Sequence, residues 1–255
     1  MELLTIPFVT TVYTFRMQNH LLLRKQSRRA FTLIEMLVVV TIIVLLLAFS
    51  TPALMKTMQS SRLSSTGDAL MGAFSEAQQL AFAQSVPVEL RFFSYDGEFG
   101  ESSLFRAYQM FKVLVVAEGA TAAAQLKESV VPVGNLIKMS DGVIIAADPT
   151  LSPALSGEQI NDEKEGGALG YSGVSGATYC AMRFMPDGTC RKVGAATTNA
   201  GVTLASLVFQ TLPESFLTIT YDIGAEITTE NLPKNFYTIQ IDPYTGKARN
   251  YKPGF

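Results

Sequence analysis

The sequence has few of the residues that catalytic and metal sites most often use. Among 255 residues there is no tryptophan, one histidine and two cysteines, and only 16% of the residues are charged. The histidine, His20, lies near the N-terminus, so a chain cut after residue 30 contains none. This argues against histidine-based nucleophilic catalysis and against histidine metal ligands in the rest of the chain. We therefore expect no enzymatic activity, no metal site and no cofactor.

Charge is also missing from a long apolar stretch. No side chain between Met36 and Phe49 is charged, and Glu35 is the one charged residue between Phe31 and Leu54. At about 1.5 Å per residue, a helix over this span is roughly 36 Å long, which is enough to cross a bilayer. We predict a transmembrane helix over 31–54. A carboxylate buried near its start costs about 2.5 kcal/mol or more unless a cation pairs with it.

The predicted helix contains no cation that could pair with Glu35. Its neighbours one turn away are apolar, and Arg28 and Arg29 belong at the membrane surface. A cut between Ala30 and Phe31 would give each molecule an α-amino group a few residues before Glu35. A neighbouring molecule could then supply the missing cation.

The residues around this bond form a recognisable signal. The segment Arg28-Arg29-Ala30-Phe31-Thr32-Leu33-Ile34-Glu35, with Pro52 late in the apolar run, resembles the class III signal of type IV pilins and type II secretion pseudopilins. In that family a membrane prepilin peptidase and methyltransferase cuts before the phenylalanine and methylates the new N-terminus. The glutamate then pairs with the N-terminal amine of a neighbouring subunit in a filament.

The resemblance assigns roles to residues of this chain. It implies cleavage between Ala30 and Phe31, methylation of Phe31 and an assembly role for Glu35. The basic residues that precede the cut, for the peptidase and for membrane topology, would be Arg24, Lys25, Arg28 and Arg29. Implied partners are the peptidase, other pilin or pseudopilin subunits, the inner membrane and an assembly platform. Because Ala30 stands where the family usually has glycine, we expect slower cutting.

Other interpretations of the N-terminal region stay open. The apolar run could be a plain signal anchor, or a secretory signal peptide cut near Ala48-Phe49-Ser50, although it is long for a signal peptide and carries a carboxylate. Residues 1–30 form the predicted leader. Translation from Met17 would give a leader of ordinary family length, and the alternative is an extra interfacial segment over 1–15.

Charge predicts the orientation in the membrane. Basic residues cluster before the apolar span, so the leader is expected in the cytoplasm and everything after Leu54 outside it, in the periplasm. Removing residues 1–30 leaves 15 basic and 21 acidic residues, a formal charge of −6. This mildly acidic body argues against a nucleic-acid partner.

The helical pattern continues beyond the membrane. Apolar residues recur at helical spacing over 55–85, which predicts an amphipathic stalk helix that continues the span. Pro52 removes a backbone donor and is expected to kink the helix. We interpret the stripe Leu70, Phe74, Ala77 and Ala81 as the face that covers a sheet of the chain's own head, rather than a binding face for another protein.

Residues 86–255 are predicted to form a β-rich extracytoplasmic head, which makes the fold α+β with a mostly antiparallel sheet. Alternating or apolar runs bounded by turn residues predict strands. These runs are 86–93, 105–116, 142–147, 179–185, 189–193, 216–222, 236–242 and 248–251. We expect surface loops at 118–129, which is alanine-rich and could form a short helix, and at 151–177.

The head adds to the resemblance through short matches. They are Ser85-Val86-Pro87-Val88-Glu89-Leu90, Phe184-Met185-Pro186-Asp187-Gly188-Thr189, Ile239-Gln240-Ile241 and Gly246-Lys247-Ala248-Arg249. In this order they are similar to the H-type minor pseudopilins and the FimT-like minor pilins, and the size and signal also resemble the prepilin-like Verru_Chthon cassette protein D group. The matches cover the chain discontinuously from Ala30 to Arg249.

Two further features leave alternatives open. Cys180 and Cys190 would lie in an oxidising compartment, which favours a disulfide, but a turn at Pro186-Asp187-Gly188 would offset them by roughly 13 Å or more, beyond the reach of a bridge. The acidic segments 162–165 and 242–246 carry oxygen ligands that calcium prefers, but neither has EF-hand spacing. We expect solvated loops there.

The sequence thus predicts a pilin-like structural subunit of a pilus or of a type II secretion pseudopilus. A different class of function is a single-pass anchored binding module that forms no filament, for which the two long loops are the argument.

Overall fold

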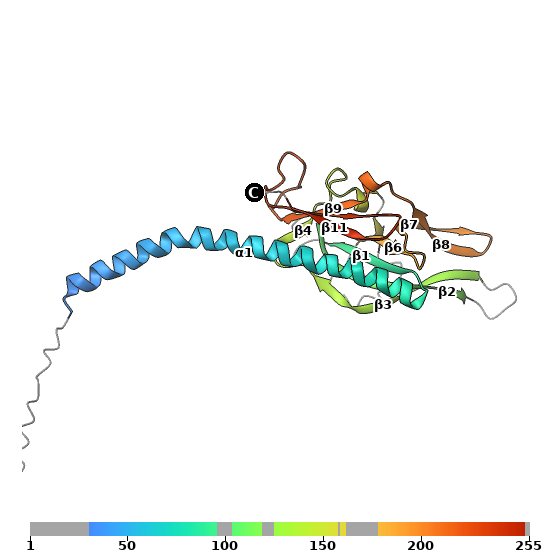
Figure 1. The fold of residues 1–255 in the computed structure, drawn as a ribbon, viewed down its shortest axis with the longest axis horizontal. Coiled ribbons are helices and arrows are strands. Elements are labelled where there is room, and N and C mark those ends of the chain that lie inside the picture. The colour runs from blue at the N-terminus through green and yellow to red at the C-terminus, as the bar shows by residue number, and fades with distance from the viewer. Residues whose placement is uncertain (1–30, 96–103, 119–124, 158, 162–177, 253–255) are drawn as a thin grey trace, which may run out of the picture. The chain divides into compact units, whose positions relative to one another are not determined.

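The computed structural model describes residues 31–95, 104–118, 125–157, 159–161 and 178–252 (Figure 1). By its internal contacts the chain divides into two units, residues 1–50 and 51–255. One long helix, α1 (Leu33–Gln84), contributes to both units, and the sheet that follows belongs to the second. The two halves of α1 therefore have different surroundings within the chain.

Helix α1 begins with a capped turn and ends where the sequence stops it. Thr32 is the N-cap, and its Oγ1 accepts a hydrogen bond from the Glu35 backbone N at 3.2 Å. At the other end Ser85 has a φ of 54°, the left-handed conformation that often follows a helix, and Pro87 disfavours further helix. The backbone is helical through Pro52, and the kink expected there stays a prediction.

A single, mostly antiparallel sheet follows the helix. Its strands are β1 (Val88–Tyr95), β2 (Leu104–Glu118), β3 (Gln125–Lys138), β4 (Val143–Ile145), β5 (Ile160–Asn161), β6 (Thr178–Phe184), β7 (Cys190–Asn199), β8 (Val202–Val208), β9 (Phe216–Tyr221), β10 (Tyr237–Ile241) and β11 (Ala248–Tyr251). Two short 3-10 helices lie between strands, η1 (Pro153–Leu155) and η3 (Leu212–Glu214). The long apolar helix and the antiparallel sheet confirm the α+β prediction.

Part of the sheet closes on itself. The strand order β1–β6–β7–β8–β3–β2 returns to β1, because β1 pairs with both β6 and β2. We call these six strands the barrel. From β2 the sheet continues outward as β4–β9–β10–β11. The pairing of β3 with β8 is parallel, and the other pairs in the described chain are antiparallel.

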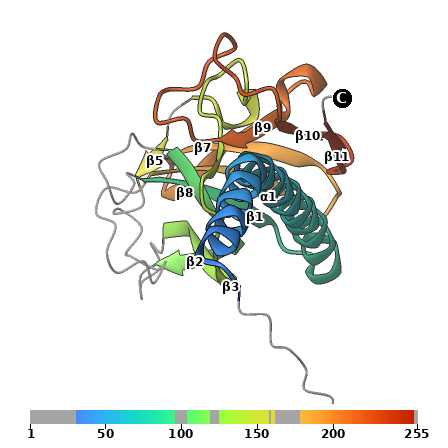
Figure 2. The ribbon, with the colours of Figure 1, turned by 90° about the vertical axis from the view of Figure 1, so that its left-hand side faces the viewer.

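Strand β1 takes part in two cores because successive side chains point to opposite faces. Its even-numbered residues Val88, Leu90 and Phe92 are fully buried in the core to which the second half of α1 contributes. Figure 2 looks along α1 from its N-terminal end toward the strands. Its odd-numbered residues face the barrel interior, where Phe93 packs with Tyr179 at a ring distance of 5.9 Å. Closure of the barrel thus gives the sheet a second buried face.

The stripe on α1 covers the sheet of its own head, as interpreted from the sequence. Leu70, Phe74, Ala77 and Ala81 are all fully buried. The ring of Phe74 lies 6.0 Å from the rings of both Phe92 and Phe184, so one helical residue joins β1 to β6. The second half of α1 is therefore part of the head and is not available to another protein along this face.

Tyr237 of β10 joins α1 to the last strands of the sheet. Its hydroxyl donates to Asp68 Oδ1 at 3.0 Å and accepts from Asn250 Nδ2 at 2.6 Å. The ring lies directly over Gly67, where an added Cβ would come within 2.7 Å of Tyr237 Cε2. Glycine at position 67, which weakens the helix locally, is explained by this close approach.

Eight predicted strand regions are strands in the structure; the ends of 248–251 are as predicted, and those of the other seven are shifted. The surface loop expected over 118–129, and the suggestion of a short helix there, are wrong for the described part, because β2 continues to Glu118 and residues 125–129 begin β3. The sequence pattern also missed β8 and the rest of β3. Of the loop 151–177, the structure gives η1 and β5, and residues 158 and 162–177 lie outside the described chain.

The contact at Gly67 predicts opposite effects for two glycines of α1. Alanine normally favours a helix over glycine by about 1 kcal/mol. We expect Gly67→Ala to lower the free energy of unfolding of the head by about 1–3 kcal/mol, because the methyl group would overlap Tyr237. Gly72 has no atom within 4 Å of an added Cβ, so Gly72→Ala should stabilise the head. Chemical unfolding of the full chain in detergent, followed by circular dichroism, measures both, and equal effects would contradict this account.

Candidate functional site

The first half of α1 exposes apolar side chains on every side. Every side chain from Phe31 to Thr51 is exposed, including Leu33 at 84% and Phe49 at 80%. Covering a large apolar side chain is worth about 1.5–3 kcal/mol, so this segment is stable only in an apolar environment or against other apolar helices. Within the described residues, α1 is the one helix whose length and composition suit a membrane crossing.

Polar groups within this apolar segment are satisfied by the helix itself. The hydroxyl of Thr41 donates to the carbonyl of Leu37 at 2.7 Å, and that of Ser50 donates to the carbonyl of Leu46 at 2.8 Å. Such bonds to the preceding turn remove the cost of placing a hydroxyl in hydrocarbon. These two hydroxyls therefore need no hydrogen-bond partner from another molecule.

Glu35 differs from these hydroxyls. Its side chain is exposed in the first turn of α1, where the helix dipole favours a negative charge. No salt bridge found in the described part of the chain includes it. Phe31, four residues earlier, is 67% exposed and immediately precedes the N-cap Thr32. The carboxylate is thus close in sequence to a free end that a cut before Phe31 would create.

The remaining predicted processing residues lie outside the described chain. They are Arg24, Lys25, Arg28, Arg29 and Ala30. For Pro52 the structure gives only a helical backbone. The structure therefore brings together Phe31, Thr32 and Glu35, and of these the sequence had not assigned a role to Thr32. The signal was present in the spacing Thr-x-x-Glu, which is typical of a helix N-terminus.

The barrel interior holds a second set of charged residues that the sequence did not single out. Arg183 of β6 bonds Glu89 of β1 at 2.5 Å and Glu128 of β3 with two bonds of 2.7 Å. Arg91 bonds the other oxygen of Glu89 at 2.9 Å. Its guanidinium lies 4.7 Å from the ring centroid of Phe111 and 4.2 Å from that of Tyr179. These four charged residues link three strands inside the barrel.

Electrostatics favour the charged forms in this network. Burial alone would raise the pKa of Glu128, but hydrogen bonds and charge from Arg183, together with the Ala205 amide, lower it below its usual value. Burial likewise opposes the charge of Arg183, and its two carboxylate partners outweigh burial and raise its pKa. Removing one member would leave an uncompensated charge, which is costly inside a protein.

The two cysteines are free thiols, so a disulfide between them does not form in this structure. The reason is the register of β6 and β7, in which Cys190 pairs with Phe184, four residues from Cys180. Cys180 Sγ donates to the Leu155 carbonyl at 3.1 Å, and burial raises its pKa to about 11. Burial raises the pKa of Cys190 as well. Both thiols are therefore protonated and unreactive at neutral pH.

The acidic turn at 242–246 uses its oxygens internally. Asp242 Oδ1 accepts from the Tyr244 backbone N at 2.9 Å, and Oδ2 accepts from Thr245 Oγ1 at 2.8 Å. In the ranges that the structure describes, no cluster of three or more histidine, cysteine or acidic side chains is placed to bind a metal ion. The segment 162–165 lies outside those ranges.

Comparison with protein families accounts for the N-terminal segment. The family model for the prokaryotic N-terminal methylation motif matches residues 25–51, which is 27 of the 255 residues. The chain carries a prepilin-type methylation motif. The motif supports a type IV pilin-like protein, and with the apolar helix it fits a membrane-anchored protein that is processed by prepilin peptidase and assembles with other pilin-type subunits. Comparison with curated proteins and with solved structures gives no match.

The lowered pKa of Glu128 predicts how the stability of the head depends on pH. Its stabilisation is present above the ordinary carboxyl pKa of 4.5 and is lost as the pH falls through the lower folded value. We expect Glu128→Gln to cost about 1–3 kcal/mol at pH 7.

The difference from the wild type should shrink below pH 4.5. Urea unfolding at several pH values measures it, with the exposed Glu230→Gln as a control that stays within about 0.5 kcal/mol. A penalty for Glu128→Gln that is the same at pH 3 and pH 7 would contradict the assignment.

Proposed function

We propose that this chain is a structural subunit of a filament, cut between Ala30 and Phe31 by prepilin peptidase, methylated at Phe31 and assembled through its apolar helix. The observation that carries this proposal is the exposed Glu35 in the first turn of an apolar helix, within a matched methylation motif. The role is structural and not enzymatic. The filament would be a type II secretion pseudopilus or a type IV pilus-like filament.

The proposed subtype is a minor pseudopilin of the H type or a FimT-like minor pilin, with the Verru_Chthon cassette protein D group as a related possibility. Its support is the order of short head motifs and an α1 stripe that packs on the following strand β1. We place the helix in the inner membrane with the leader in the cytoplasm and the head in the periplasm, because the basic residues precede the span.

In the filament, the physical role of Glu35 is to select one arrangement of neighbours. A carboxylate in an apolar bundle is stable beside the N-terminal ammonium of an adjacent subunit and unstable elsewhere. The apolar side chains around α1 allow many packings, since they are similar on all sides. A single charge pair would favour one stagger among them.

A second candidate function is a membrane-anchored binding module that forms no filament. The observation that favours it is a cavity in the head, inside the barrel. N-terminal sequencing of the protein from its native membrane separates the two. Methylated Phe31 as the first residue supports the filament subunit, whereas an intact leader supports the anchored module.

The pairing role of Glu35 is tested by substitution. We expect Glu35→Ala to be cut and inserted into the membrane but to appear at least about tenfold less in sheared filaments, since the charge pair is lost. Thr41→Ala is the matched control, because its hydroxyl bonds only within the helix and its loss should leave assembly unchanged. Immunoblots of the filament and membrane fractions measure both. Normal incorporation of Glu35→Ala would refute the role.

The position of the cut is tested separately. A bulky residue at the small position before the cut should block the peptidase, so Ala30→Leu co-expressed with prepilin peptidase should keep the electrophoretic mobility of the uncut chain. Ala30→Gly, which restores the usual family residue, should be cut at least as fast as the wild type. Cutting of Ala30→Leu at the wild-type rate would show that the bond lies elsewhere.

A further inference from the structure

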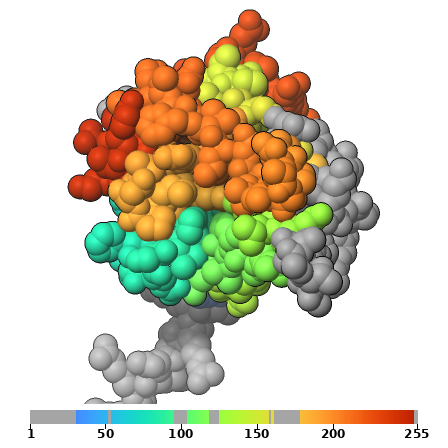
Figure 3. Space-filling model, turned by 90° about the vertical axis from the view of Figure 1, so that its right-hand side faces the viewer, coloured from blue at the N-terminus to red at the C-terminus, as the bar shows by residue number. Residues whose placement is uncertain are grey.

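The interior of the barrel is only partly filled. Interior positions of a small barrel are normally occupied by side chains that pack against one another. Here Phe93, Phe111 and Tyr179 belong to one buried cluster, and a cavity of about 460 Å³ lies beside Tyr179. Its volume is in the range of small-molecule sites, about 300–1,000 Å³. Figure 3 shows the β2–β3 hairpin in green against the β7–β8 hairpin in orange, and these two hairpins contribute much of the cavity wall.

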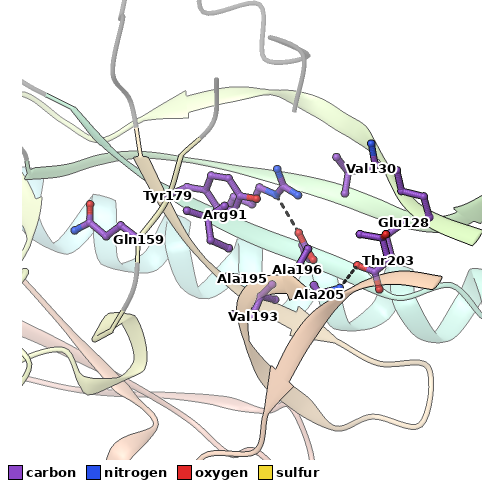
Figure 4. Close-up of a pocket in the computed structure, with 14 residues that line it drawn as sticks. Arg91, Glu128, Val130, Gln159, Tyr179, Val193, Ala195, Ala196, Thr203 and Ala205 are labelled. Carbon is purple, nitrogen blue, oxygen red and sulfur yellow. Dashed lines mark hydrogen bonds and ion pairs between the residues drawn. The ribbon is translucent and has the colours of Figure 1, made fainter. Parts of the chain in front are cut away.

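Small residues of β7 and β8 make this space. The residues on that side have no side-chain atom beyond Cβ, and they are Gly194, Ala195, Ala196 and Ala205. Strand β7 also has a register shift between Gly194 and Ala196, which gives it one extra residue there. Figure 4 shows Arg91, Tyr179 and Val130 across the cavity from these alanines. The space between these two walls is the cavity.

The charged residues inside the barrel already have partners of opposite charge. Glu89, Arg91 and Glu128 line the cavity. Glu89 bonds both Arg91, at 2.9 Å, and Arg183, at 2.5 Å, and Glu128 also bonds this second arginine, at 2.7 Å. A charged ligand would lose its hydration on entry and would find no unpaired opposite charge among these four residues. The network therefore favours a neutral ligand.

The other polar residues of the wall add no charge to the interior. Successive side chains of a strand point to opposite faces, and Glu128 points into the barrel toward Arg183, so its neighbour Lys127 points outward. Gln159 and Thr203, which also line the cavity, are neutral. A ligand would therefore meet apolar side chains and two neutral hydrogen-bonding groups in addition to the paired charges.

We propose that the cavity binds a neutral small molecule with an apolar ring and a hydroxyl group. The ring would lie between the alanines of β7 and β8 and the ring of Tyr179, where aromatic packing adds to the burial of apolar surface. Gln159 and Thr203 supply hydrogen-bond partners for the hydroxyl group. This inference goes beyond the proposed filament role, and a site inside the barrel is compatible with a filament subunit and with an anchored module.

The test uses the full chain in lipid nanodiscs and three probes that share one naphthalene ring. These are naphthylmethanol, naphthoate and naphthylmethylammonium, which are neutral, negative and positive at neutral pH. We expect naphthylmethanol to bind about tenfold more tightly than either charged probe in equilibrium dialysis, after subtraction of the uptake by empty nanodiscs. A lack of binding of all three probes up to about 1 mM would overturn the proposal, and so would a charged probe that binds as tightly as naphthylmethanol.

Two substitutions on β7 show whether the probe enters the cavity. Ala196 lines the cavity, and Thr197 is its neighbour on the opposite face of the strand. Both side chains are exposed, so tryptophan at either position leaves the buried core in place. Ala196→Trp should fill the cavity and weaken the binding of naphthylmethanol by about tenfold or more, and Thr197→Trp should weaken it by less than about twofold. Equal effects of the two substitutions would overturn the proposal.

The introduced indole ring also reports on the cavity itself. The chain contains no tryptophan, so the indole emission of each variant comes from one ring. We expect Ala196→Trp to emit at a shorter wavelength than Thr197→Trp, because the cavity is less polar than water. Equal emission maxima would show that an apolar ring does not enter the cavity and would overturn the proposal. Neither cleavage nor filament assembly is needed for these measurements, so their outcome is independent of the proposed filament role.

Discussion

The contact between the second half of α1 and strand β1 is the interaction on which the rest of the head depends. Phe74 touches aromatic rings on both β1 and β6, and the alanines that follow it allow the helix to lie close to the sheet. Because this contact fixes one face of β1, the opposite face of the same strand must be covered by something else. Closure of β6, β7, β8, β3 and β2 around that face provides the cover.

This arrangement explains why charged residues are found inside the head. Glu89 and Arg91 alternate with Leu90 and Phe92 along β1, and alone they would be typical of a solvated outer face. In the closed barrel they are almost fully buried, and Arg183 and the aromatic rings around Arg91 compensate the burial. The polar residues of β1 thus take part in a linked network, not in a solvent-facing surface.

Local sequence patterns predicted most of the fold. The predictions failed where a strand is defined by its pairing with other strands rather than by its own sequence pattern. The eight expected strands and the buried stripe of α1 follow from alternation and helical spacing within short windows. Strand β3 was missed because Pro132 and Gly134 interrupt it and its side chains are mostly exposed or half-buried. The pairing of β2 with β1 closes the barrel and buries Glu89. No local sequence pattern in either strand predicts this pairing. The methylation motif was evident in sequence because its residues are contiguous.

Among the described residues, the acidic side chains of the barrel and of the apolar half of α1 differ in whether they have a salt-bridge partner. In the barrel, Glu89 and Glu128 both form salt bridges with Arg183, so their negative charges have partners within the same molecule. In the apolar half of α1, the hydroxyls of Thr41 and Ser50 are also satisfied internally, but Glu35 has no salt-bridge partner among the described residues. In the proposed filament, the N-terminal amine of a neighbouring subunit would supply that partner.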